Sequence, residues 1–242
     1  MLTKTRAIVL HSMKYGDQKI IVEMLTADLG RVSFACRLPK TQRGKLKKQL
    51  FQSLTLLDIE LDFRQGAALQ TLRDVQMAHP FASIPFDAAK LSISLFVAEF
   101  LLHATRGEQQ NEPLFQYIEN SMMWLDGQTR SFANFHLVFM MRLSRFIGFF
   151  PNLEDYHDGD YFDLRNGTFV AAQPVHQEFV VPDEAAHIGK LMRMGFESMH
   201  LFRLSRHERN RCAELILTYY QLHVPNFPEL RSLAVLKELY GE

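Results

Sequence analysis

The sequence predicts an α+β protein: a small five-stranded barrel at the N-terminus, followed by an all-α domain that carries one inserted β-hairpin. In the first eighty residues, short runs of β-branched and aromatic residues alternate with polar ones, which is typical of strands. From residue 81 onward, apolar residues recur every three or four positions, which is typical of helices. At 242 residues, 47% of them hydrophobic, the chain can bury a sizeable core. We therefore expect one domain over residues 1–80 and a second over residues 81–242.

Five alternating runs in the N-terminal part are expected to form antiparallel strands. They are residues 5–10, 19–26, 31–37, 54–63 and 69–75. Tyr15-Gly16-Asp17 and Asp28-Leu29-Gly30 supply Gly-containing turns between the first three runs. The fourth run, LTLLDIELDF, alternates apolar and acidic residues. Because five strands in so short a segment would leave exposed edges in an open sheet, a closed or nearly closed barrel is favoured.

Five later segments carry the helical period. They are residues 87–107, 111–127, 131–148, 205–223 and 230–240. Asn111 is a cap residue shortly before Pro113, and proline suits the first turn of a helix. Ser205 and Glu208 form a capping box, and Pro225 ends the helix that this box opens.

An insertion interrupts the helices at about residues 151–182, a stretch rich in Asp, Gly and aromatic residues. Tyr161–Leu164 faces Thr168–Ala171 across Arg165-Asn166-Gly167, which predicts a β-hairpin with a type I′ turn. The insertion contains several aspartates, but the Gly and the Glu that an EF-hand calcium loop needs at fixed positions are absent from it. The ten histidines show no HExxH spacing and the two cysteines form no CxxC pair, so we expect no metal site and no cofactor.

Charge is distributed unevenly, although the formal net charge is zero. Residues 1–80 hold 13 Lys and Arg against 7 Asp and Glu, and no carboxylate lies between Asp28 and Asp58. The seven cations between these two aspartates are Arg31, Arg37, Lys40, Arg43, Lys45, Lys47 and Lys48. They form either a solvated surface connection or a loop that follows the phosphates of a single-stranded nucleic acid. The aromatic candidates for base stacking, which also suit core positions, are Tyr15, Phe34 and Phe51.

The third predicted helix offers a second charged surface. Arg142 and Arg145 lie three positions apart in FMMRLSRFIGFF, among Met and Phe residues. They lie either on the solvent-exposed face of a core helix or at the rim of an apolar groove suited to an acidic, aromatic peptide tail. Arg203 and Arg206 would join that rim if the fold brings them near.

Motifs for catalysis do not occur in the sequence: there is no GxSxG elbow, no P-loop and no GxGxxG. Cys212 falls in a predicted helix, where a small buried side chain is expected rather than a reactive thiolate. The apolar stretches are too short or too interrupted for a signal peptide or a membrane span. We expect a cytoplasmic protein that is not an enzyme and has no membrane partner.

The residues on both sides of the basic stretch resemble a known family. TKTRAIVLHSMKYGDQKIIVEMLTADLGRVSFACR and LTLLDIELDF resemble the N-terminal OB fold of the RecO recombination mediators, with an I-V-L strand, a Y-G-[DE] turn, a V-x-x-L-T strand and a D-x-G turn in this order. RLSRFIGFFPNLEDY is similar to the L-x-x-x-G-x-x-P segment that leads into a knuckle-like insertion of that family. Many RecO proteins carry four cysteines in this insertion and bind zinc, whereas residues 151–174 contain none. Zinc is therefore not implied here, and hairpin pairing with aromatic packing would replace it.

The resemblance implies a non-enzymatic DNA repair and recombination protein. RecO proteins bind single- and double-stranded DNA, anneal complementary strands and pair with RecR. They also contact the acidic C-terminal tail of single-stranded DNA-binding protein, so that RecA loads on gapped DNA. On this basis we expect the basic stretch to neutralise phosphates and the groove near Arg142 and Arg145 to receive the tail. Two other interpretations stay open: an OB-type RNA-binding protein, and a protein–protein adaptor whose basic loop merely solvates the barrel.

Overall fold

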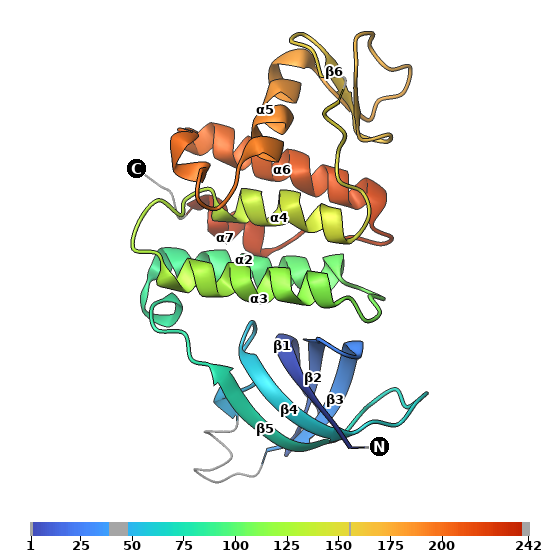
Figure 1. Ribbon diagram of the computed structural model, residues 1–242, viewed down its shortest axis with the longest axis vertical. Coiled ribbons are helices and arrows are strands. Elements are labelled where there is room, and N and C mark those ends of the chain that lie inside the picture. The colour runs from blue at the N-terminus through green and yellow to red at the C-terminus, as the bar shows by residue number, and fades with distance from the viewer. Residues whose placement is uncertain (1, 39–47, 155, 239–242) are drawn as a thin grey trace. The chain divides into compact units, whose positions relative to one another are not determined.

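The computed structural model describes residues 2–38, 48–154 and 156–238 (Figure 1). The chain forms two compact units, Met1–Gly127 and Gln128–Glu242. The first unit therefore extends beyond the N-terminal strands and includes the helices at Ala88–Ala104 and Glu112–Gly127. This division into units differs from the expected domain boundary at residue 80. Whether residues 1–80 fold as a domain of their own stays a prediction.

The first unit contains a five-stranded antiparallel sheet with the strand order β3-β2-β1-β4-β5. The strands are β1 (Leu2–Lys14), β2 (Lys19–Thr26), β3 (Gly30–Arg37), β4 (Leu56–Asp62) and β5 (Leu72–His79). The sheet curls strongly (Figure 1), and its two edges approach each other at an isolated parallel bridge between Phe34 and Gln70. The N–H of Ala35 donates to the carbonyl of Gln70 at 2.9 Å, and the N–H of Gln70 donates to that of Ser33 at 2.8 Å. The barrel is thus nearly closed, without a continuous ladder between β3 and β5.

Alternating side chains of the strands fill the barrel core. Val9, Val22 and Leu57 are fully buried, as are the rings of Phe34 and Phe51. Burying one such ring contributes about 1.5–3 kcal/mol relative to leaving it exposed. The two phenylalanines considered for base stacking are therefore core residues.

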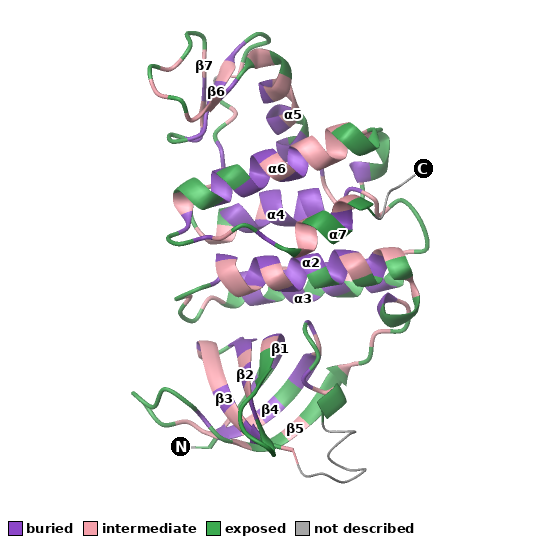
Figure 2. Ribbon diagram, turned by 180° about the vertical axis from the view of Figure 1, so that it is seen from behind, coloured by how far each residue is buried: buried purple, intermediate pink, exposed green. Residues whose placement is uncertain are grey.

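The last strand begins three residues later than the sequence pattern predicts. Gln70 is buried, and its side-chain amide donates to the carbonyls of Arg64 and Ala67 while accepting from the N–H of Arg64. These bonds fasten the loop before β5, so Gln70 belongs to the closure of the barrel rather than to the strand. β5 itself is exposed along most of its length (Figure 2).

Two helices complete the first unit and lie side by side (Figure 1). They are α2 (Ala88–Ala104), preceded by the short 3₁₀ turn η1 (Ile84–Phe86), and α3 (Glu112–Gly127). Both confirm helices expected from the sequence. The carboxylate of Asp87 caps α2 by accepting the N–H groups of Ala89 and Lys90 at 2.9 and 3.0 Å.

Asp126 joins the end of α3 to the segment before α2. Its carboxylate accepts the backbone N–H groups of Ala82, Ser83 and Ile84, each at 2.8 Å. Burial alone would raise the pKa of Asp126, but these hydrogen bonds outweigh it and hold the pKa below its ordinary value. The buried ammonium of Lys90 donates to the backbone carbonyl of Asp126 at 3.1 Å.

The turn between β2 and β3 packs against the loop between α2 and α3. Gly30 has a φ of +68°, and the N–H of Arg31 donates to the carbonyl of Glu108 at 3.1 Å. A Cβ atom on Gly30 would lie 2.5 Å from the carbonyl carbon of Gln109. Glycine is required here both for its backbone conformation and for the close approach.

The second unit consists of four helices, one 3₁₀ turn and a small three-stranded sheet within its described residues. They are α4 (Phe135–Phe146), β6 (Tyr161–Asp163), β7 (Thr168–Val170), β8 (Phe179–Val180), α5 (Pro182–Arg193), η2 (Met199–Leu201), α6 (Arg206–His223) and α7 (Ser232–Glu238). The capping box of Ser205 and Glu208 is present at the start of α6, which confirms that prediction. α5 and β8 were not expected from the sequence, although Pro182, Asp183 and Glu184 at the start of α5 and Lys190 and Arg193 at its end are helix-end signals.

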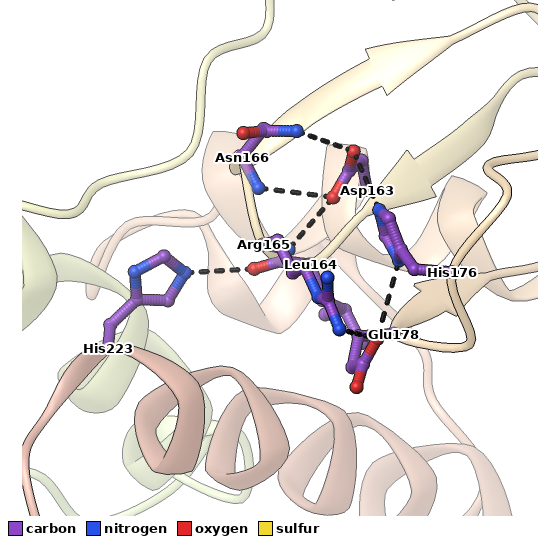
Figure 3. Close-up of polar contacts among 7 residues, drawn as sticks. All are labelled: Asp163, Leu164, Arg165, Asn166, His176, Glu178 and His223. Carbon is purple, nitrogen blue, oxygen red and sulfur yellow. Dashed lines mark hydrogen bonds and ion pairs between the residues drawn. The ribbon is translucent and has the colours of Figure 1, made fainter.

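The predicted hairpin in the insertion is confirmed, but its type I′ turn is wrong. Asp163 lies opposite Thr168, so the loop holds four residues, and Asn166 lacks the positive φ that a type I′ turn needs. Gly167 adopts a φ of +65°, and its N–H donates to the carbonyl of Asp163 at 2.8 Å. The carboxylate of Asp163 also accepts the N–H groups of Arg165 and Asn166 (Figure 3), which favours the longer turn.

Aromatic packing under the hairpin matches the expectation for an insertion without cysteines. The rings of Tyr156 and Phe169 meet edge to face at 4.6 Å, and the rings of Phe162 and Phe169 lie tilted to each other at 4.9 Å. Phe162 is fully buried and also contacts Tyr219 of α6.

Candidate nucleic-acid interface

The turn between β1 and β2 brings four cations together at one end of the barrel. Lys14 ends β1, Lys19 begins β2, and the N–H of Tyr15 donates to the carbonyl of Lys19 at 2.9 Å. Lys19 lies opposite Arg37 in the ladder between β2 and β3. Lys48 lines the same groove as Lys14 and Lys19. We call Lys14, Lys19, Arg37 and Lys48 the basic end of the barrel.

The four cations of the basic end are exposed and carry no ion pair to any described carboxylate. Two other exposed cations of the barrel have acidic partners: Lys4 pairs with Glu60, and the Nε atom of Arg73 lies 2.6 Å from the Oδ2 atom of Asp62. Asp17 is the acidic residue among those that line the two grooves beside the basic end. The basic end therefore keeps its positive charge available to a polyanion.

The segment between Leu38 and Lys48 holds the other predicted phosphate contacts. Lys40, Arg43, Lys45 and Lys47 lie outside the described residues. The flanks of the segment are described: the N–H of Leu38 donates to the carbonyl of Gln18 at 2.7 Å, and both Leu38 and Lys48 line the groove beside the β1–β2 turn. The segment therefore begins and ends at the basic end.

Arg31 lies away from the basic end and binds groups of its own unit. Its side chain is 14% exposed, and its guanidinium forms an ion pair with Glu23. The same guanidinium donates to the carbonyl of Leu102 in α2 at 2.6 Å. These bonds fasten β3 to β2 and α2, so we leave Arg31 out of the proposed interface.

Tyr15 differs from the other two aromatic candidates because its side chain is 58% exposed, beside Lys19 and Arg37. Lys14 and Lys19 were not among the residues chosen from the sequence. A hairpin that turns at residues 15–18 brings both residues to the turn. Lys14 is paired with Ile20 and Lys19 lies opposite Tyr15, so the two side chains leave opposite faces of the sheet.

The four arginines of the proposed tail groove are not brought together by the second unit. α4 and α6 run parallel, because Asn134 before α4 contacts Arg209 near the start of α6, while Phe149 after α4 stacks on His223 at its end. Arg145 therefore lies at the end of this helix pair opposite to Arg206.

Three of these arginines have identified contacts. The Nε atom of Arg142 donates to the carbonyl of Met194 at 3.1 Å, and Arg206 donates twice to the carbonyl of Lys237. The guanidinium of Arg145 is exposed and lies 4.1 Å above the ring of Phe150. Arg203 is exposed in the segment before α6.

The insertion holds a group of four titratable side chains that contact one another (Figure 3). His176 lies 3.2 Å from Asp163 and 3.5 Å from Glu178, and Arg165 lies 2.7 Å from Glu178. Burial would raise the pKa of Asp163, but hydrogen bonds from Asn166, His176 and Arg165 lower it. Among the described residues, no three His, Cys, Asp or Glu side chains are placed to share a metal ion.

Two further observations bear on the sequence-based expectations. Cys36 and Cys212 are both buried, and burial raises the pKa of the Cys212 thiol to about 11. No helix in the described ranges combines the length and apolar character needed to cross a membrane.

Comparisons with known proteins identify the family. The family model described as Recombination protein O N terminal matches residues 1–81, and the model described as Recombination protein O C terminal matches residues 85–234. A protein named DNA repair protein RecO from Bacteroides fragilis is 51% identical over 241 residues, covering 99% of this chain and all of the relative. Proteins of the same name from Phocaeicola vulgatus and Flavobacterium psychrophilum are 48% and 30% identical, each over the full length of both chains. With an OB-fold N-terminal region and matches along almost the whole sequence, this chain belongs to the RecO family of DNA repair proteins.

Proposed function

We propose that this chain binds single- and double-stranded DNA through the basic end of the barrel and the basic segment that joins it. The observation that carries the proposal is the basic end itself, because its four exposed cations have no carboxylate partner among the described residues. Phosphate contacts supply most of the affinity in sequence-independent DNA binding. Lys40, Arg43, Lys45 and Lys47 would add to these contacts.

The finer activities of the family complete the proposal. The chain would anneal complementary strands and, together with RecR, help RecA to load on gapped DNA coated by single-stranded DNA-binding protein. It would act in the cytoplasm as a binding protein rather than as an enzyme. The acidic tail of single-stranded DNA-binding protein would contact the second unit, where exposed Arg145 on the ring of Phe150 offers charge and apolar surface together.

The double variant Lys14→Gln/Lys19→Gln tests the DNA interface. We expect its affinity for a labelled oligothymidylate to fall about tenfold at low salt, because two phosphate contacts are lost. The slope of log K against log salt concentration should become shallower by roughly 1.4, since each contact on a single strand contributes roughly 0.7. Fluorescence anisotropy titrations at several salt concentrations measure both quantities.

A matched control removes the same charge from another part of the barrel. Lys4→Gln/Arg73→Gln deletes two exposed cations that are paired with Glu60 and Asp62. Surface pairs of this kind contribute about 0–1 kcal/mol, so the fold should persist. Equal losses in the two double variants would mean that net charge, not the basic end, governs binding. Parallel titrations with RNA of the same length test the two other interpretations. Tighter binding to RNA than to DNA would favour an RNA-binding protein, and no binding to either polymer would favour a protein–protein adaptor.

A further inference from the structure

Tyr15, Lys19 and Arg37 form a row across three neighbouring strands at the basic end. The N–H of Tyr15 bonds to the carbonyl of Lys19, which continues the ladder between β1 and β2, and Lys19 lies opposite Arg37 in the next ladder. Residues directly opposite each other point to the same face of a sheet, and adjacent strands are about 4.8 Å apart. The other face at this position is the barrel core, where Ile20 and Cys36 are buried. The row therefore lies on the outer surface.

A second row of apolar side chains lies next to the first on the same face. Met13 is paired with Ile21, and Ile21 is paired with Ala35. The side chain of Met13 is 46% exposed, and the other two are partly exposed. This end of the barrel thus presents an aromatic ring and two cations beside an open apolar strip.

An exposed aromatic ring next to cations has a defined chemistry toward nucleic acid. Proteins that bind single strands combine a positive groove for the backbone with aromatic rings on which unpaired bases stack. In a duplex, the faces of each base are covered by its neighbours, so a ring on the protein surface cannot stack on them. Tyr15 also contributes little to the barrel core, because more than half of its side chain is exposed.

We propose that Tyr15 stacks on an unpaired base while Lys19 and Arg37 hold the adjacent phosphates, and that this contact makes the basic end prefer single-stranded over duplex DNA. The inference rests on the proposed DNA binding at the basic end. The inference adds a residue, Tyr15, that distinguishes single-stranded from duplex DNA. Phosphate contacts alone do not make this distinction.

The variants Tyr15→Ala and Tyr15→Trp test the proposal in the full-length protein. Affinity is measured by anisotropy for an oligothymidylate of about 20 nucleotides, longer than the 4–16 nucleotides that one OB fold covers, and for a duplex of the same length. We expect Tyr15→Ala to weaken single-strand binding about tenfold, which is within the range for loss of one stacked base. Duplex affinity should change less than twofold. Tyr15→Trp should retain single-strand affinity because it keeps a ring.

Salt dependence separates stacking from charge. The slope of log K against log salt should stay unchanged in Tyr15→Ala, since stacking releases no counterions. Phe86→Ala is the matched control, because Phe86 is an 86% exposed ring of the same unit outside the basic end. It should leave both affinities unchanged.

Three outcomes would overturn the proposal: an unchanged single-strand affinity in Tyr15→Ala, an equal loss for duplex, or a loss in Tyr15→Trp as large as in Tyr15→Ala. Failure of the DNA interface itself is distinguishable from these. If Lys14→Gln/Lys19→Gln binds both forms like the unmodified protein, the basic end is not the DNA site. If that variant is weakened but Tyr15→Ala is not, the phosphate contacts stand and the stacking contact does not.

Discussion

At Gly30, an added side chain would be opposed in two ways. Gly30 combines a φ of +68° with a backbone contact to the loop between α2 and α3. Gly66 has a similar φ of +78° but nothing within 4 Å of the place where a Cβ atom would lie. The two glycines therefore separate the energetic cost of the backbone conformation from that of the contact.

We predict that Gly30→Ala lowers the free energy of unfolding by about 3 kcal/mol and Gly66→Ala by about 1 kcal/mol. The left-handed conformation alone costs an alanine roughly 1–2 kcal/mol, and the blocked approach to Gln109 adds to this at Gly30. Urea denaturation followed by circular dichroism measures both values. If the two variants lost equal free energies of unfolding, the loop between α2 and α3 would have to move away from the alanine side chain at position 30 at no energetic cost.

Single residues also show what the sequence could and could not indicate about the site. The absence of carboxylates around the basic stretch selected Arg37 and Lys48, which the structure places at the basic end of the barrel. It also selected Arg31, whose ion pair with Glu23 depends on cross-strand pairing that the charge pattern does not contain. Lys14 was not predicted as a contact residue because it lies outside the basic run in the sequence. The turn between β1 and β2 nevertheless places Lys14 in the groove that Lys48 also lines.

Among the elements, the inserted hairpin is held by side chains that converge on Asp163 (Figure 3). Its carboxylate accepts bonds from the backbone of Arg165, from the backbone and side chain of Asn166, and from His176. Hydrogen bonds to a charged group contribute about 1.5–3 kcal/mol each, so this one residue has a large share in the stability of the hairpin.

We predict that Asp163→Ala lowers the local opening free energy of the hairpin by about 3 kcal/mol, whereas Asp158→Ala, an exposed aspartate of the same insertion, changes it by less than 0.5 kcal/mol. Hydrogen exchange of the amides in residues 161–170 measures the difference. Similar exchange in both variants would contradict a special role for Asp163.

The pH dependence of this hairpin follows from the lowered pKa of Asp163. A carboxyl whose pKa is lower in the folded state stabilises it fully above its unfolded pKa of about 4, and the stabilisation is lost as the pH falls below that value. Protection of the hairpin amides should decrease below about pH 4 in the unmodified protein and change less in Asp163→Ala.

End signals in the sequence decided only part of the helix predictions, since α5 begins with Pro182 and two acidic residues and ends with basic ones but was missed. Ser205, Glu208 and Pro225 defined α6 in advance. The turn of the hairpin was mispredicted because Asn-Gly favours a two-residue loop, whereas the bonds that Asp163 makes to the following backbone favour a longer one. Such a choice depends on tertiary surroundings: Gly167 lies against the hydroxyl of Tyr219, far away in sequence.

At the scale of the whole molecule, the two proposed ligand surfaces lie in different units. The basic end lies in the first unit, and the exposed Arg145 lies in the second. If DNA and an acidic tail use these separate surfaces, neither ligand should displace the other.

We predict that a labelled acidic, aromatic tail peptide binds the full-length protein equally well with and without saturating oligothymidylate. Arg145→Ala should weaken peptide binding about fivefold, because one ion pair and its apolar support are lost, and should leave DNA affinity unchanged. Arg130→Ala, another exposed arginine of the second unit, serves as the control. Release of the peptide by DNA would show that both ligands share one surface.

The β-rich fold and the basic character of its end were accessible from residue patterns because both depend on local alternation and composition. How far the barrel closes was not, since closure depends on the bridge between Phe34 and Gln70, which are distant in sequence. The dispersal of the four arginines in the second unit likewise depends on the parallel arrangement of α4 and α6, which no local pattern encodes.

The position of Leu38 and Lys48 beside one groove affects how the connection between them can vary in length. A connection whose two ends emerge at neighbouring points can be lengthened or shortened without disturbing the strands that anchor it, and each doubling of its length adds only about 0.6 kcal/mol of closure entropy. Under the proposed DNA binding, we expect changes in the length of this connection to alter the number of phosphate contacts, and with it the salt dependence of binding, while the strands that anchor it stay unchanged.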